Sequence, residues 1–211
     1  MRKLLLSIAT MALLPGVANA AAFQNGSFED GPDAGSFITL SAGDTSVTGW
    51  TVGAGTVDYI GSYWVASDGT NSFDLSGNGI GSISQTFDTI AGLTYNVTFD
   101  LAGNPAGDPA TKTLLTMATG GSTQTDTFTV TGANTLANMG WQTFSYSFVA
   151  QSASSTLTFS SDTATAFGPA LDNVTVTAVP EPAAWALMIG GFGLVGGAMR
   201  RRVTKIGYVA V

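Results

Sequence analysis

Alternation of apolar and polar residues dominates the chain between residues 23 and 177. The stretch TYNVTFDL at residues 94–101 places aromatic and aliphatic side chains on one face and Thr, Asn and Asp side chains on the other. The stretches TFSYSF at 143–148, STLTFS at 155–160 and DNVTVTA at 172–178 repeat this pattern. Because successive side chains of a β-strand point to opposite faces, a period of two predicts half-buried strands.

Clusters of turn-forming residues separate the alternating stretches. They are GPDAGS at 31–36, SDGTN at 67–71, SGNGIG at 76–81, AGNPAGDP at 102–109 and TGGST at 119–123. No run with a helical period precedes Pro180. Many short strands with polar outer faces predict an all-β fold, an antiparallel β-sandwich or jelly roll.

The N-terminus has the layout of a secretory signal peptide. Arg2 and Lys3 precede an apolar run at residues 4–14, and Ala18-Asn19-Ala20 fits a cleavage site. The apolar run is too short to cross a bilayer. We therefore expect export of the chain, with residues 1–22 as the signal peptide.

The last 30 residues follow a different pattern. Pro180 and Pro182 interrupt the strand pattern, and residues 183–199 carry no charge before three consecutive arginines. As a helix this run is roughly 25 Å long, slightly shorter than the ~30 Å hydrocarbon core of a bilayer. We expect one short hydrophobic helix, a transmembrane segment at 183–199, with the arginines and a tail at 203–211 on the cytoplasmic side.

Charge and composition restrict the function. Residues 23–179 contain one lysine, Lys112, and 13 acidic residues, a formal charge of −12. Such a surface repels phosphate backbones, so nucleic acid is excluded as a partner, whereas divalent cations and neutral sugars suit it. With no cysteine there is no disulfide, and the domain depends on its core.

The absence of histidine and cysteine also restricts catalysis. It excludes histidine acid–base chemistry, Ser-His-Asp triads and cysteine nucleophiles. A carboxylate pair that hydrolyses glycosides stays open, but among 13 acids some pair lies close by chance. We expect a protein that is not an enzyme.

The C-terminal residues resemble a known sorting signal. Pro180-Glu181-Pro182, then Trp185-Ala186-Leu187-Met188, a Gly-rich apolar stretch and Arg200-Arg201-Arg202 resemble the PEP-CTERM signal, here at 179–202. The resemblance implies a Gram-negative bacterium that makes extracellular polysaccharide, and an exosortase that processes the tag near the PEP motif. The anchor in the inner membrane is then temporary, and the protein goes to the cell envelope or extracellular matrix. Nine residues follow the arginines, more than the family pattern usually has.

The domain at 23–178 carries a second resemblance. Its landmarks are FQNGSFEDG at 23–31, GW at 49–50, ASDGTNSFDLSG at 66–77, GSISQTFDTIAGLTYNVTFDLAGNP at 81–105 and ALDNVTV at 170–176. This series resembles the choice-of-anchor C and DUF642-like group, and more broadly carbohydrate-binding modules with the galactose-binding-like jelly roll. The resemblance implies the same fold here.

A structural calcium ion is implied by the same resemblance. In such modules an early Glu and a late Asp ligate calcium, and Glu29 and Asp172 match them, with the carbonyl of Ser27 as a further ligand. Calcium prefers carboxylate and carbonyl oxygens. Asp172 is in phase with apolar Val174 and Val176, where a carboxylate needs a partner or a metal. The alternatives are a surface Asp at a strand end or a carboxylate satisfied by backbone N–H groups.

Sugar binding in these modules uses aromatic faces together with amide and carboxylate groups. The candidate ligand-binding residues lie in VDYIGSYW at 57–64 and in AGNP: Asp58, Tyr59, Tyr63, Trp64 and Asn104. For the aromatic residues the alternative is burial in the core.

The sequence therefore predicts an exported, non-catalytic module that binds carbohydrate or associates with the extracellular polysaccharide matrix. One alternative is a structural or adhesion protein of the biofilm matrix without a sugar site. A glycoside hydrolase is a further alternative.

Overall fold

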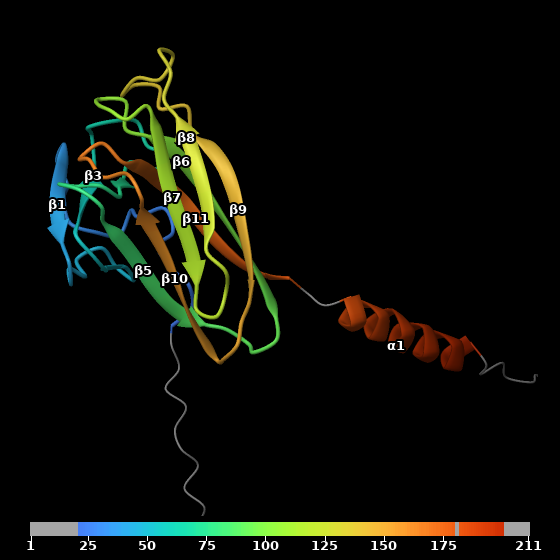
Figure 1. The fold of residues 1–211 in the computed structure, drawn as a ribbon. Helices are drawn as coiled ribbons and strands as arrows, with labels where there is room; N and C mark the ends of the chain where they lie inside the picture. Colours follow the sequence, from blue (N-terminus) through green and yellow to red (C-terminus); the bar gives the residue numbers. More distant parts are fainter. Residues whose placement is uncertain (1–20, 180–181, 201–211) are drawn as a thin grey trace, which may run out of the picture.

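The computed structural model describes residues 21–179 and 182–200. Two antiparallel sheets pack as two layers, and one helix follows them in the chain (Figure 1). The six-stranded sheet contains, in spatial order, β1 (Phe37–Ser41), β3 (Thr56–Ile60), β4 (Ser72–Asp74), β11 (Pro169–Val179), β6 (Thr94–Gly103) and β9 (Gln142–Val149). The five-stranded sheet contains β2 (Thr51–Val52), β5 (Ser82–Asp88), β10 (Ser154–Ser161), β7 (Thr111–Ala118) and β8 (Gln124–Thr129).

The connections between strands are those of a jelly roll. Only β3–β4 and β7–β8 join neighbouring strands of one sheet, and every other connection carries the chain to the opposite sheet. The predicted antiparallel β-sandwich is therefore confirmed. The β3–β4 connection, residues 61–71, is long for a hairpin and forms a loop at one end of the sheet.

The core lies between the two sheets and is rich in aromatic side chains. Phe159 of β10 packs edge-on against Phe99 of β6, with ring centroids 5.2 Å apart, and so joins the two layers. Trp50 lies 6.2 Å from Phe159 and 5.2 Å from Phe28. Phe28 in turn lies 4.9 Å from Phe73 of β4. All five are buried. Strand alternation turns Phe73, Phe99 and Phe159 inward, whereas Phe28 and Trp50 reach the core from the segments before β1 and β2.

Strand β11 contains the main irregularity of the six-stranded sheet. Its pairing with β6 shifts register between Asp172 and Thr175, and Asn173 has a φ of 50°. This bulge interrupts the alternation after Asp172, so Asp172 lies on the other face of the sheet from Val174. Asp172 is fully buried because the β3–β4 loop covers it.

The helix α1 (Pro182–Arg200) covers the segment that was expected to be helical. Within residues 21–179 and 182–200, no helix combines the length and the apolar character that crossing a membrane needs. Five of the 19 residues of α1 are glycines, which add no apolar side chain. The helix lies where one was expected, and the transmembrane segment at 183–199 stays a prediction.

Several predicted features lie outside the described residues. They are most of the signal peptide (1–20), Pro180 and Glu181 of the processing motif, Arg201 and Arg202, and the tail at 203–211. Pro182 begins α1, and Arg200 ends it with an exposed side chain.

Replacement of the aromatic ring that joins the layers tests this packing. Phe159→Ala should lower the free energy of unfolding by about 3–5 kcal/mol, because it leaves a cavity between the sheets. Ile90→Ala, at a 63 % exposed site, is the control and should change it by less than about 0.5 kcal/mol. Denaturant unfolding measures both, and a loss below about 1 kcal/mol for Phe159→Ala would contradict the packing described.

Candidate functional site

A small cavity lies on the outer face of the six-stranded sheet, at the edge formed by β1 and β3. We call it the sheet-edge cavity. Its volume is about 210 Å³, below the ~300–1,000 Å³ of drug-sized ligand sites, so it suits a single ring. Its lining comes from three strands and four connections: Phe37, Thr39, Asp58, Ile60, Tyr63, Asp74, Gly77, Asn78, Asn104, Ala166 and Phe167.

Three of the five predicted ligand-binding residues, Asp58, Tyr63 and Asn104, meet in this cavity. Asp58 is half-buried and accepts a hydrogen bond from the hydroxyl of Thr39 at 2.6 Å. Tyr63 is half-buried, and its ring lies 5.4 Å from the ring of Phe37, which is 45 % exposed. The cavity therefore brings an exposed aromatic surface next to a carboxylate.

Tyr59 is not available for binding, which corrects one predicted contact. Its ring is fully buried, and its hydroxyl donates to the carbonyl of Phe28 at 2.6 Å. Asp58 and Tyr59 are consecutive in β3, so their side chains point to opposite faces of the sheet. Asp58 lines the cavity, and Tyr59 packs in the core.

Asp74 forms the floor of the sheet-edge cavity. It is the Cα partner of Asp58 across β3 and β4, and it is 1 % exposed. Its carboxylate accepts hydrogen bonds from Asn104 Nδ2 at 2.8 Å and from the backbone N–H groups of Ser76 and Gly168. Burial raises its pKa to about 7, and these hydrogen bonds oppose the rise.

The polar atoms of Asn104 are already engaged within the protein. Its Nδ2 donates to Asp74, and its Oδ1 accepts from the backbone N–H of Ala106 at 2.9 Å. Asn104 is 5 % exposed. It supports the floor of the cavity and holds Asp74 in place.

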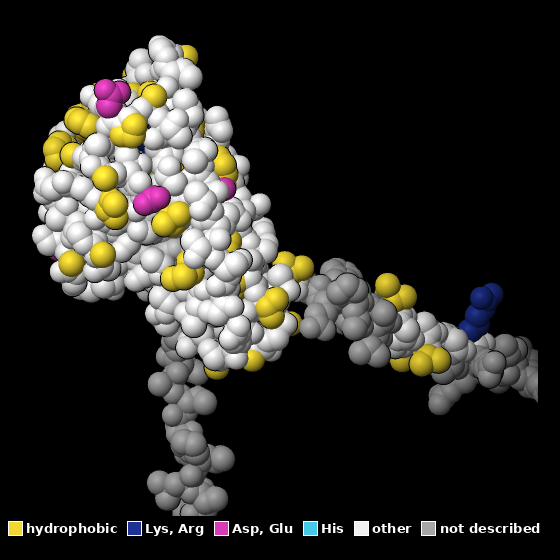
Figure 2. Space-filling view, in the orientation of Figure 1, with side chains coloured by type: hydrophobic (Ala, Val, Ile, Leu, Met, Phe, Trp, Pro, Cys, Tyr) yellow, Lys and Arg dark blue, Asp and Glu magenta, His cyan; other side chains and the backbone are white. Residues whose placement is uncertain are grey.

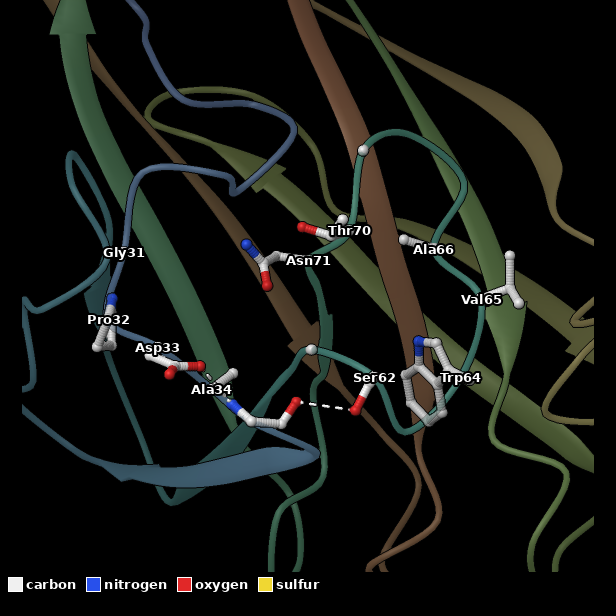
Figure 3. A pocket seen from close by; sticks show the side chains of 13 residues that line it. Gly31, Pro32, Asp33, Ala34, Ser62, Trp64, Val65, Ala66, Thr70 and Asn71 are labelled. Atoms are coloured by element: carbon white, nitrogen blue, oxygen red, sulfur yellow. Dashed lines mark hydrogen bonds between the residues drawn. The ribbon is translucent and has the colours of Figure 1, made fainter.

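A second, larger cavity of about 670 Å³ lies beside the β3–β4 loop, and we call it the loop cavity. In Figure 3 the segment with Pro32 and Asp33 faces the loop that carries Trp64 and Asn71. Trp64, the fifth predicted contact, lines this cavity but is 4 % exposed. Its indole N–H donates to Ser72 Oγ at 2.8 Å, so the ring mainly supports the loop.

Buried carboxylates hold the β3–β4 loop from below. Asp172 accepts hydrogen bonds from the backbone N–H groups of Ser67 at 2.7 Å and Asp68 at 2.9 Å. Asp100, its Cα partner in β6, accepts from the hydroxyl of Ser67 at 2.6 Å. Burial alone would raise the pKa of Asp100, but hydrogen bonds from Ser67, Thr143 and Asn173 hold it below its usual range.

Glu29 holds the other end of the loop. It accepts from the backbone N–H groups of Thr70 at 2.8 Å and Asn71 at 2.7 Å, and from the hydroxyl of Thr70 at 2.7 Å. Gly69 has a φ of 63°, and a Cβ there would lie 2.5 Å from Glu29 Oε1. Glycine is therefore required for the loop to approach this carboxylate.

These contacts test whether the residues predicted to bind calcium suit that ion. Glu29 and Asp172 contact different parts of the loop, and their oxygens accept N–H groups, which a cation would repel. Ser27 lies in the turn before Phe28. Within the described residues, no group of three or more acidic side chains is placed to share a metal. The arrangement does not fit calcium, which stays a prediction from the resemblance alone.

Several residues of the sheet-edge cavity were not predicted from the sequence. Phe37 and Phe167 supply aromatic walls, and Asn78 supplies an exposed amide. The alternation in FITLS at residues 37–41 could have placed Phe37 on the same face as Thr39. No sequence signal showed that the segments around Asn78 and Phe167 fold over this face.

Comparison with known families identifies both parts of the chain. Residues 21–177 match the family described as "Protein of unknown function (DUF642)". The chain belongs to this family. Residues 178–202, which follow the DUF642 domain, match the PEP-CTERM protein-sorting motif, so the chain is exported and sorted to the cell envelope or the extracellular space.

One curated relative of the DUF642 domain is Halomucin of Haloquadratum walsbyi, 33 % identical over 190 residues and 83 % of this chain. The match spans about 2 % of the length of Halomucin.

Solved structures with a similar arrangement include three carbohydrate-binding modules. TmCBM61, in complex with β-1,4-galactotriose, is 17 % identical with a TM-score of 0.44, over 75 % of this chain and 99 % of that one. A family 35 module from Clostridium thermocellum is 14 % identical with a TM-score of 0.43, and the match covers 69 % of this chain and 95 % of that module. The xylan-binding CBM22-1 domain from Paenibacillus barcinonensis Xyn10C is 18 % identical with a TM-score of 0.45, and the match covers 68 % of this chain and 94 % of that domain.

A chelator tests whether Glu29 and Asp172 hold the β3–β4 loop directly, through its N–H groups, or through a calcium ion. Because Glu29 and Asp172 bind the loop directly, EDTA should change the melting temperature of the DUF642 domain by less than about 1 °C. Added calcium should have equally little effect. A midpoint that falls by several degrees with EDTA, and recovers with calcium, would contradict the contacts described.

The buried carboxylates also predict how stability depends on pH. The pKa values of Asp74 and Asp172 rise from an ordinary 3.8 to about 7, mainly through burial. Between these values the folded state keeps protons that the unfolded chain releases, so the free energy of unfolding should fall as pH rises from 4 to 7. Glu29 and Asp100, whose pKa values are lowered, act in the opposite direction only at about pH 4.5 and below.

Denaturant unfolding at about pH 5 and about pH 8 measures this dependence. We expect the domain to be more stable at the lower pH, and Asp74→Asn to reduce the difference. Asp88→Asn, at an exposed site on β5, is the matched control and should leave the difference unchanged. Equal stability of the wild-type protein at both pH values would contradict the raised pKa values of Asp74 and Asp172.

Proposed function

We propose that this chain is an exported, non-catalytic carbohydrate-binding module of a Gram-negative bacterium. An exosortase-type enzyme recognises its C-terminal motif at the inner membrane, and the mature domain goes to the envelope or extracellular polysaccharide matrix. The PEP-CTERM match supports the sorting step. The sheet-edge cavity supports carbohydrate as the ligand.

The observation that carries the proposal is the pairing of Phe37 and Tyr63 beside Asp58. Phe37 is nearly half exposed although it lies on a strand, and its ring leans edge-on against Tyr63. A pyranose ring has an apolar face that packs on aromatic rings and hydroxyl groups that bind carboxylates and amides. The cavity offers both kinds of contact within the space of one ring.

The surface of the domain also favours a neutral or cationic polysaccharide over a polyanion. The face in Figure 2 shows acidic side chains that are scattered singly among uncharged ones. The single lysine of residues 23–179, Lys112, is fully buried and donates to the carbonyl of Gly107 at 2.7 Å. A polyanion would therefore meet repulsion without a compensating cation.

Hydrolysis is less well supported than binding, although Asp58 and Asp74 both line the cavity. A glycosidase needs one carboxyl group that gives its proton to the glycosidic oxygen. Asp74 has the raised pKa that this role requires, but it is 1 % exposed and both its oxygens accept hydrogen bonds from the protein. These contacts fit a structural carboxylate.

Phe37→Ala tests the proposal with little risk to the fold, because the side chain is 45 % exposed. On a glycan array and in titration calorimetry, the wild-type protein should bind at least one polysaccharide, and Phe37→Ala should weaken binding by about tenfold or more. The control is Ile90→Ala, another exposed apolar side chain, which should bind as the wild type does. The proposal fails if the wild-type protein binds no polysaccharide, including the exopolysaccharide of its own host, which would favour a structural matrix protein.

A further inference from the structure

The carboxylate of Asp58 in the sheet-edge cavity is only partly satisfied. Its Oδ1 accepts the hydroxyl of Thr39, and no described residue donates a hydrogen bond to its Oδ2. Asp58 is half-buried, and burial raises its pKa above the ordinary range. A carboxylate in this position gains most from a ligand group that carries both a positive charge and N–H donors.

A second carboxyl group, that of Asp74, lies next to Asp58, although burial raises its pKa to about 7. The two residues are Cα partners on neighbouring antiparallel strands, so their side chains lie on the same face. No Lys or Arg is among the residues that line the cavity. Lys112, the one cation in residues 23–179, is buried with its Nζ on the carbonyl of Gly107. Lys112 interacts electrostatically with Asp74 from outside the lining, so the negative charge that a ligand can meet in the cavity is that of Asp58.

The aromatic walls favour the same class of ligand. Phe37 and Tyr63 form one wall, and Phe167 belongs to the lining contributed by the segment before β11. An aromatic face attracts a cation as well as the apolar side of a sugar ring. A ring that carries an ammonium group can therefore contact the aromatic walls and Asp58 together.

We propose that the sheet-edge cavity selects a sugar ring with a protonated amino group, such as a 2-amino-2-deoxyhexose unit of a deacetylated polysaccharide. The ammonium group pairs with Asp58, and the ring packs against Phe37 and Tyr63. This specificity rests on the proposed carbohydrate-binding function and narrows its ligand class. An N-acetylated unit lacks the charge, and a uronic acid is repelled by Asp58.

Titration calorimetry with two series of three matched trisaccharides tests the proposal. The probes are the β-1,4-linked glucosamine trimer, its N-acetylated form and cellotriose, which differ only at the 2-position, and the corresponding sugars of the galactose series. The full-length protein should bind the amino sugar of at least one series about tenfold more tightly than its two counterparts. Asp58→Asn, which keeps the size of the side chain and an oxygen for Thr39, should reduce this preference to about threefold or less.

Asp88→Asn is the matched control, because it removes one exposed negative charge on β5, in the sheet that does not carry the cavity. It should keep the full preference. Equal loss of preference in both variants would overturn the proposal, because the attraction would then come from the overall charge. Equal binding of all three sugars, with binding lost in Phe37→Ala, would overturn the amino-sugar specificity and leave carbohydrate binding intact. Failure of all these trisaccharides to bind would overturn the amino-sugar specificity, and carbohydrate binding would be overturned with it only if the glycan array is also negative.

Discussion

The structure depends on three carboxylates that hold the β3–β4 loop by its backbone. Asp172 binds the N–H groups of Ser67 and Asp68, Asp100 binds the hydroxyl of Ser67, and Glu29 binds the N–H groups of Thr70 and Asn71. Asp172 and Asp100 are buried, and a buried carboxyl group without hydrogen-bond partners is costly, whereas solvent weakens the contacts of the exposed Glu29. Loop and carboxylates therefore require each other. The opening segment with Glu29 and the closing strand with Asp172 meet at this loop, which explains why both ends of the domain carry distinctive motifs.

The fixed loop determines the shape of both cavities. It connects β3 to β4, so its first residues follow the strand that carries Asp58, and its last residues precede the strand that carries Asp74. Tyr63 reaches Phe37 on the outer face of the sheet, whereas Trp64 is buried against Ser72 and supports the loop. Two aromatic residues that are neighbours in sequence thus have different roles, one in the sheet-edge cavity and one in packing.

The alternation of apolar and polar residues was enough to predict the β-sandwich, because residues 23–177 contain no helical run that would compete with a period of two. Because neighbouring side chains of a strand point to opposite faces, Asp58 and Tyr59 of β3 cannot both contact the same ligand. Applied to β3, this rule would have removed Tyr59 from the predicted ligand-binding residues. The bulge in β11 could not be read from DNVTVTA, because it depends on pairing with β6. Phe37 and Phe167 were missed for a similar reason, since only the tertiary fold brings them to Asp58.

Chemical-shift mapping by NMR is the most direct test that the sheet-edge cavity is a carbohydrate site. The isotope-labelled protein would be titrated with the oligosaccharide that binds most tightly on a glycan array. Shift changes should concentrate at Phe37, Asp58, Tyr63 and Asn78, while the far edge of the five-stranded sheet at β8 stays unchanged. Shift changes confined to other surfaces, with none around Phe37 and Tyr63, would contradict the site described.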